Sequence, residues 1–123
     1  EHTSIEEENE LLDIDYYNNS ITKMINEIGG NSIFFVFARD LIWAKNNLPK
    51  GFKYVFVEQK VTNDLYEFIL MSKCKNFILA NSTFSWWAAY ISGSKNVIYR
   101  EQVNQFIGIE DNYFPDNWSK YSK

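Results

Sequence analysis

The sequence predicts an α/β fold in which a Rossmann-like parallel sheet carries helices on both faces. Short apolar runs of strand length recur along the chain, segments with helical periodicity alternate with them, and glycine- or proline-containing turns separate the two. Because strand–helix–strand units cross over with a fixed right hand, this alternation gives parallel strands covered on both sides. Such sheets bind ligands beyond the carboxyl ends of their strands, which is where we expect the chemistry.

The first residues are acidic and contain few large apolar groups. Residues 1–14 are therefore predicted to form a flexible, solvated arm, and residues 15–123 to form the folded domain. The acidic run of this arm contains Glu6, Glu7, Glu8, Glu10 and Asp13.

The first helix and strand follow directly. Apolar residues recur three or four apart over residues 15–28, which predicts a helix that ends at Gly29-Gly30. Residues 32–38 are continuously apolar, β-branched and aromatic, a pattern typical of a strand buried on both faces.

A second unit of the same kind comes next. We expect a helix over residues 40–47, a strand over 53–58 and a helix over 62–74. Asp64 is a candidate cap of the last of these helices. Its buried stripe is predicted to contain Leu65, Phe68, Ile69 and Ser72.

Two strands and one helix complete the prediction. Residues 76–80 and 96–100 have strand composition, and residues 83–92 form a helix that Gly93 ends. The predicted core stripe of that helix is Phe84, Trp87, Ala88 and Ile91. The tail to residue 123 is predicted to be irregular, with Pro115 and Trp118 packing back on the domain.

Composition excludes several functions. The net charge of −4 argues against a nucleic-acid partner, which needs a basic face. The single histidine, His2, rules out a Ser-His-Asp or Cys-His arrangement, and Cys74 has no partner for an intrachain disulfide, which favours a reducing cytoplasm. Apolar runs are too short for a membrane helix. With no Asp-x-Asp pair at a strand end, no metal site or cofactor is expected.

The strongest candidate site lies between the strand 76–80 and the helix that follows. Asn81, Ser82, Thr83, Phe84 and Ser85 place small hydroxyl groups at a helix N-terminus, whose unpaired N–H groups and partial positive charge can hold a diphosphate without a metal. The alternative is that Ser82 or Thr83 only caps the helix.

Two acids follow other strands. Asp40 is either a ligand for a base or sugar hydroxyl or the N-cap of the helix 40–47, and Arg39 beside it is a candidate cation. Glu58 lies where nucleotide-binding folds place an acid on ribose hydroxyls, but no glycine-rich loop accompanies it, so a solvated strand-end charge is the alternative.

Three segments carry a family resemblance. The residues Asp64-Leu65-Tyr66, Leu70 to Asn76, and Asn81 to Ala89 closely resemble the C-terminal block of the α-1,2-fucosyltransferases, glycosyltransferase family 11. The segment Phe35 to Trp43 is similar to that family's preceding strand, although Ala38-Arg39 replaces Ser-Asp in its Phe-Ser-Asp-Asp pattern. The family's His-x-Arg-Arg-Gly-Asp-Tyr segment, expected upstream, is not in this chain.

The resemblance implies one half of a GT-B-like inverting enzyme that moves L-fucose from GDP-fucose to the 2-hydroxyl of a galactose acceptor. Ser82, Thr83 and Ser85 would face the diphosphate, with Asp40 and Glu58 near the nucleoside. No catalytic residue is expected in this part, and the full-length bacterial enzyme would be cytoplasmic or peripheral to the membrane. The alternative is a nucleotide-binding module that is inactive on its own.

Overall fold

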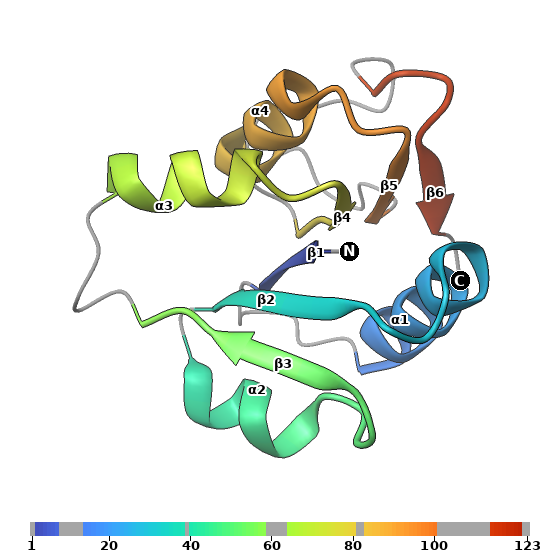
Figure 1. Ribbon diagram of the computed structural model, residues 1–123, viewed down its shortest axis with the longest axis vertical. Coiled ribbons are helices and arrows are strands. Elements are labelled where there is room, and N and C mark those ends of the chain that lie inside the picture. The colour runs from blue at the N-terminus through green and yellow to red at the C-terminus, as the bar shows by residue number, and fades with distance from the viewer. Residues whose placement is uncertain are drawn as a thin grey trace.

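The fold is an α/β sandwich built on one six-stranded sheet (Figure 1). The computed structural model describes residues 2–7, 14–38, 40–58, 64–80, 83–100 and 114–121. In these ranges the elements are β1 (His2–Glu7), α1 (Ile14–Ile28), β2 (Ile33–Ala38), α2 (Leu41–Asn47), β3 (Lys53–Phe56), α3 (Asp64–Ser72), β4 (Asn76–Ile78), α4 (Thr83–Ser92), β5 (Asn96–Arg100) and β6 (Ser119–Tyr121).

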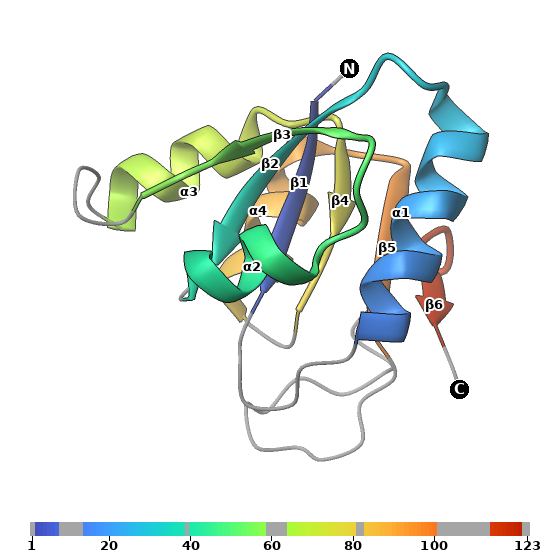
Figure 2. The same cartoon turned by 90° about the horizontal axis from the view of Figure 1, so that it is seen from below.

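All neighbouring strands run parallel, in the order β3-β2-β1-β4-β5-β6. Helices α1 and α2 cover one face of the sheet, and α3 and α4 cover the other, as Figures 1 and 2 show. This confirms the predicted Rossmann-like architecture with helices on both faces.

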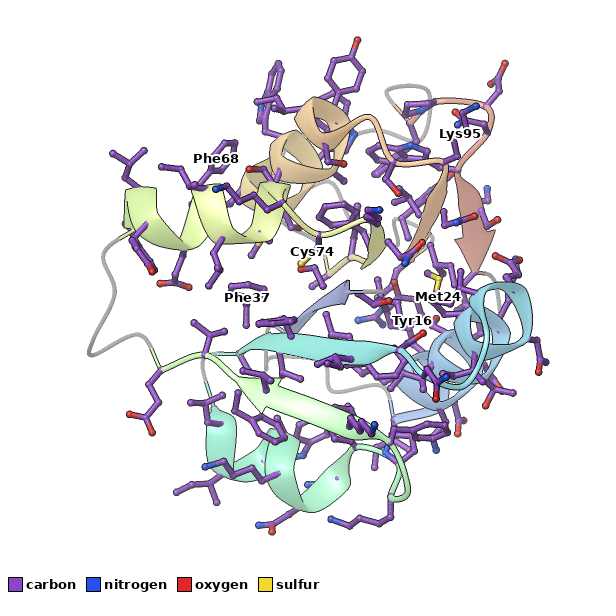
Figure 3. The ribbon with its side chains drawn as sticks, in the orientation of Figure 1. Tyr16, Met24, Phe37, Phe68, Cys74 and Lys95 are labelled. Atoms are coloured by element: carbon purple, nitrogen blue, oxygen red, sulfur yellow. The ribbon has the colours of Figure 1, made fainter. Side chains whose placement is uncertain are left out.

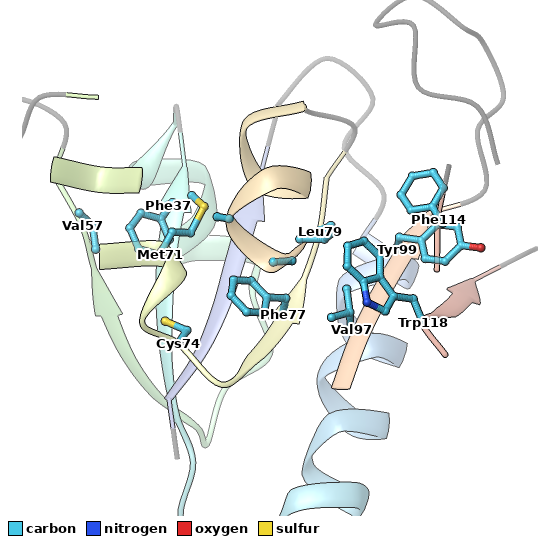
Figure 4. Packing of buried hydrophobic residues seen from close by; sticks show 12 residues of the cluster. Phe37, Val57, Met71, Cys74, Phe77, Leu79, Val97, Tyr99, Phe114 and Trp118 are labelled. Atoms are coloured by element: carbon cyan, nitrogen blue, oxygen red, sulfur yellow. The ribbon is translucent and has the colours of Figure 1, made fainter. Parts of the chain in front are cut away.

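The strands bury alternate side chains in two separate cores. On the α1–α2 side the core contains Phe34, Val36, Ile78 and Ile98. The intervening residues of the same strands enter the α3–α4 side, where the core includes Phe37, Phe77, Leu79, Val97 and Tyr99 (Figure 4). Because successive strand side chains point to opposite faces, a continuously apolar strand serves both cores at once.

The prediction of an N-terminal arm is wrong for the residues that the structure describes. Residues 2–7 form β1, which pairs with β2 on one side and β4 on the other. Ile5 is fully buried among residues of the α1–α2 core, and Thr3 and Ser4 are buried too. The acidic composition hid the strand, because the buried run Thr3 to Ile5 contains a single large apolar side chain.

The predicted buried stripes of α3 and α4 are wrong in part: Ala88 is buried and Phe68 and Phe84 pack against the core, as predicted, but the other large apolar members are exposed. In α3 the buried side chains are Glu67 and Met71, whereas Leu65 and Ile69 are exposed. In α4 the sheet-facing residues are small, and Trp87 and Ile91 point outward. The inward residues of α4 are Ser85, Ala88 and Ala89, all fully buried. Neither helix has a polar face opposite an apolar one, so periodicity could not select the buried side.

The helix stops agree with the sequence prediction, and the C-terminal tail agrees with it in part. Gly29 and Gly93 follow α1 and α4 with φ of 96° and 72°, the left-handed conformation that favours glycine, as predicted for the helix stops. The prediction of an irregular tail is wrong at residues 119–121, which form β6 and extend the sheet. Trp118 is buried in the α3–α4 core, as predicted. Among the described helices, none has the length and apolarity needed to cross a bilayer.

Candidate functional site

The strand order places a topological switch point at the carboxyl ends of β1 and β4. The helix after β1 lies on one face of the sheet and the helix after β4 lies on the other, so the chain diverges between these two strands. Open parallel sheets bind ligands at this topological switch point, and the order found here is that of the dinucleotide-binding folds. A ligand site is therefore expected where residues 79–83 leave β4.

The connection from β4 to α4 occupies this edge. Leu79 and Ala80 continue beyond β4 and are buried, and α4 begins at Thr83. Asn81 and Ser82 lie outside the described residues, as does the side chain of Thr83. The first-turn N–H groups of an α-helix have no partner within the helix and can bind an anion. The predicted hydroxyl-rich segment thus leads from the switch point into a helix N-terminus.

Two further residues of that segment are used for packing. The Phe84 ring meets the Phe68 ring edge-on at 5.4 Å between centroids, which joins α4 to α3. Ser85 is fully buried on the side of α4 that faces the sheet. The prediction that Ser85 faces a diphosphate does not agree with this burial, because its hydroxyl lies under the helix and away from solvent.

Tyr16 of α1 reaches the same edge from the opposite face. Its hydroxyl donates to the carbonyl oxygen of Leu79 at 2.5 Å and lies 3.2 Å from that of Ile98. The amide of Leu79 also donates to the Ile98 carbonyl, at 2.9 Å. The buried phenol, labelled in Figure 3, therefore links the residue that follows β4 to the middle of β5.

Arg100 adds a cation at this edge. It is the last residue of β5, and the carbon of its guanidinium group lies 5.3 Å from the centre of the Tyr16 ring. A guanidinium over an aromatic face is held by cation–π attraction. Neither residue was predicted from the sequence. Arg100 had a positional signal, because it ends the predicted strand 96–100, whereas Tyr16 had none, because the residues before it were predicted to form an arm.

Asp40 and Glu58 lie on the other side of the switch point. Asp40 caps α2, since its Oδ1 accepts from the amide of Trp43 at 2.9 Å, so the capping alternative is confirmed. Glu58 is exposed just beyond β3, the edge strand. With neighbouring strands about 4.8 Å apart, the end of β2 lies about 10 Å from that of β4. Arg39 lies outside the described residues.

The Cys74 thiol and the Tyr54 phenol both stay protonated near neutral pH, so neither is a reactive nucleophile. Burial raises the pKa of the Cys74 thiol to about 11, so it stays protonated near neutral pH. Burial likewise raises the pKa of Tyr54 to about 12. Within the described ranges, no group of three or more histidine, cysteine or acidic side chains could hold a metal ion.

Comparisons with known proteins agree on one family. The profile of glycosyl transferase family 11 matches residues 3–121. The chain is 34% identical over 99 residues to the O-antigen biosynthesis glycosyltransferase WbnK of Escherichia coli, which covers 80% of this chain and 32% of that protein. It is 33% identical over 116 residues to an alpha-1,2-colitosyltransferase of Escherichia coli, covering 88% of this chain and 39% of that protein. No solved structure matches the chain.

The chain thus spans between about a third and two fifths of the length of these relatives. Within that part, the matched region begins in β1 and ends in β6, so it contains the whole described sheet and both sides of the switch point. The chain belongs to glycosyl transferase family 11.

Proposed function

We propose that this chain is the donor-binding part of a glycosyltransferase and holds the diphosphate of a nucleotide sugar where β4 enters α4. The observation that carries the proposal is that the described chain leaves β4 beside the switch point of the sheet and resumes at Thr83 with the N-terminus of a 10-residue helix. Family membership supports a nucleotide sugar as the ligand.

Within this proposal the donor is GDP-fucose, and the parent enzyme transfers L-fucose with inversion to the 2-hydroxyl of a galactose residue. The name of one relative, the alpha-1,2-colitosyltransferase, specifies an α-1,2 linkage but a different sugar, colitose. The linkage therefore supports transfer to a 2-hydroxyl, while the donor sugar has to be tested by comparing GDP-fucose with GDP-colitose.

We propose two sets of donor contacts, one with the diphosphate and one with the nucleoside. Asn81, Ser82 and Thr83, with the first N–H groups of α4, bind the diphosphate, and this needs no metal ion. Asp40 and Glu58 lie toward the nucleoside. Phe84 contributes by fixing α4 against α3. Ser85 holds α4 on the sheet and is not among the proposed ligands.

The test separates a hydroxyl that binds ligand from one that only caps the helix. Ser82→Gly removes the hydroxyl, and glycine at an N-cap costs only a few tenths of a kcal/mol of stability. We expect calorimetry to show at least fivefold weaker GDP binding by Ser82→Gly, with affinity restored in Ser82→Thr. Added EDTA should leave GDP affinity unchanged.

The matched control is Ser92→Ala at the other end of the same helix, where the Ser92 hydroxyl donates to the carbonyl of Ala89. It should bind GDP like the unaltered chain. Equal GDP affinity of Ser82→Gly and the unaltered chain, with both folded by circular dichroism, would contradict the proposed diphosphate contact. Weak binding by every form would contradict the donor-binding role itself.

A second candidate is a nucleotide-binding module without activity of its own. It is favoured by the 32% and 39% coverage of the relatives, since the remaining chain of such enzymes would supply the acceptor site and catalytic groups. Under this reading the chain binds GDP but transfers no radiolabelled fucose to a β-galactoside. Measured transfer by this chain alone would reject it.

A further inference from the structure

The lysines and arginines that the structure describes are unevenly distributed between the two edges of the sheet. Because the strands run parallel, every strand begins at the amino edge, and the connecting helices run back toward that edge. Lys23 and Lys45 lie in the later halves of α1 and α2. Arg100 ends β5 at the carboxyl edge, and Lys120 lies on the outermost strand, β6. The other described lysines precede or begin a strand: Lys50, Lys53, Lys73, Lys75 and Lys95.

The carboxyl edge carries exposed acids instead. Four of them lie just after a strand or at the start of a helix: Asp15, Asp40, Glu58 and Asp64. Acids at this edge oppose the binding of a diphosphate, and the N-terminus of α4 supplies only about half an elementary positive charge against them. A diphosphate is therefore favoured at this edge where a full positive charge lies close to the start of α4.

Arg100 lies beside the strand that leads to α4. Ile98 of β5 pairs with Ile78 of β4, and the amide of Leu79 donates to the Ile98 carbonyl at 2.9 Å, so the two segments stay in register beyond β4. Two residues further along each segment, Arg100 is level with Ala80, after which the chain leaves for α4. With adjacent strands about 4.8 Å apart, the Arg100 backbone lies about one strand spacing from that point.

Tyr16 holds the guanidinium group of Arg100 in place. The central carbon of that group lies 5.3 Å from the centre of the Tyr16 ring. The ring is itself fixed, because Tyr16 is fully buried and its hydroxyl donates to the Leu79 carbonyl. A cation–π contact engages the face of the ring, whereas the five N–H donors of a guanidinium form a fork that matches phosphate oxygens. A side chain held in advance loses less conformational freedom when it binds a ligand.

We propose that Arg100 binds the diphosphate of the nucleotide sugar, which rests on the donor-binding function proposed above. Helices α1 and α4 lie on opposite faces of the sheet, so the diphosphate lies between the N-terminus of α4 on one side and the guanidinium group over Tyr16 on the other (Figure 1). The alternative is a structural role, in which Arg100 only joins β5 to α1. A phosphate contact affects ligands that carry phosphate, whereas a structural role affects a nucleoside and a nucleotide alike.

The test compares the binding of GDP and guanosine by nuclear magnetic resonance titration, which also detects weak binding. We expect Arg100→Gln to weaken GDP binding at least about tenfold, because a hydrogen-bonded charge is lost, and guanosine binding less than about twofold. Arg100→Lys should restore part of the GDP affinity, since lysine keeps the charge but not the planar fork.

The matched control is Lys95→Gln. Lys95, labelled in Figure 3, is exposed, directly precedes the same strand at the amino edge, and its substitution removes the same charge. This variant should bind GDP and guanosine within about twofold of the unaltered chain, because exposed charges separated by more than about 8–10 Å are largely screened at physiological salt.

Two results would overturn the role of Arg100 and leave the donor site standing. One is GDP affinity that is unchanged in Arg100→Gln although Ser82→Gly weakens it, and the other is an equal loss of GDP and guanosine affinity. An unaltered chain that binds no GDP would overturn both proposals. Circular dichroism and urea unfolding show whether each variant is folded. If Arg100→Gln is not folded, Arg100→Met takes its place, because methionine keeps an apolar stem against the Tyr16 ring.

Discussion

Tyr16 illustrates how a single side chain couples elements that are distant in sequence. Its hydroxyl bridges the carbonyl oxygens of Leu79 and Ile98, which are 63 and 82 residues away. Its ring contacts the Tyr121 ring of β6 at 5.3 Å and supports the Arg100 guanidinium group. Residue 79, just after β4, and the middle of β5 are therefore held from the α1 side, next to the connection that leads into the proposed donor site. The sequence indicated only that residue 16 begins a helix.

Removing the Tyr16 hydroxyl should destabilise the chain measurably. Tyr16→Phe leaves the Leu79 carbonyl buried without its donor, which costs about 1–3 kcal/mol. Tyr54→Phe is the comparison, because its half-buried hydroxyl donates only to the Pro49 carbonyl at a surface turn. We expect urea unfolding to show a larger loss for Tyr16→Phe. Equal losses would mean that the bridge between β4 and β5 contributes little.

At the scale of elements, the existence and order of the helices and strands from residue 14 to residue 100 follow from the sequence. Helix stops at Gly29 and Gly93, and apolar strands of three to six residues, are local signals that tertiary packing did not override. The orientation of α3 and α4 was not predictable in this way. Both are apolar on more than one side, and the sheet accepts the small side chains of α4 in preference to its large ones.

The orientation of α4 predicts that two substitutions lower the stability of the chain by unequal amounts. Ala89→Leu forces extra volume between α4 and the sheet and should cost about 1–3 kcal/mol. Trp87→Ser alters the outer face and should cost less than about 1 kcal/mol. If Trp87→Ser proved the more damaging change, α4 would have the orientation that the sequence suggested.

At the scale of the whole molecule, β1 decides the topology. It lies between β2 and β4, so the switch point and the proposed site exist only because residues 2–7 enter the sheet. The segment was predicted to be an arm, because acids dominate its composition. A central parallel strand can nevertheless be specified by a few side chains, since its backbone hydrogen bonds are shared with two neighbours.

Ile5 provides the test of this arrangement. It is fully buried and pairs with Val36 of β2 and Ile78 of β4, so Ile5→Ala should lower the free energy of unfolding by about 2–5 kcal/mol. A solvated arm would tolerate the same change within about 0.5 kcal/mol. Urea unfolding followed by circular dichroism distinguishes the two, and Ile42→Ala on the exposed side of α2 is the control.

The candidate site was only partly visible in the sequence. Residues 81–83 were identified because hydroxyl groups at a strand–helix junction form a local pattern, and the family resemblance was confirmed over residues 3–121. Asp40 proved to be a helix cap, and Ser85 proved to be buried. Tyr16 and Arg100 could not be found this way, because their relation to the β4–α4 connection depends on strands that pair across the sheet.

By itself the sequence determined the fold class, the family and the junction where a diphosphate site is proposed, because periodicity, turn residues and short motifs are local properties of the chain. Only the tertiary structure decided that β1 is a central strand, which sides of α3 and α4 are buried, and which residues meet at the switch point. Those outcomes depend on competition between segments for the same core and on hydrogen bonds between strands far apart in sequence, and no local pattern records either of them.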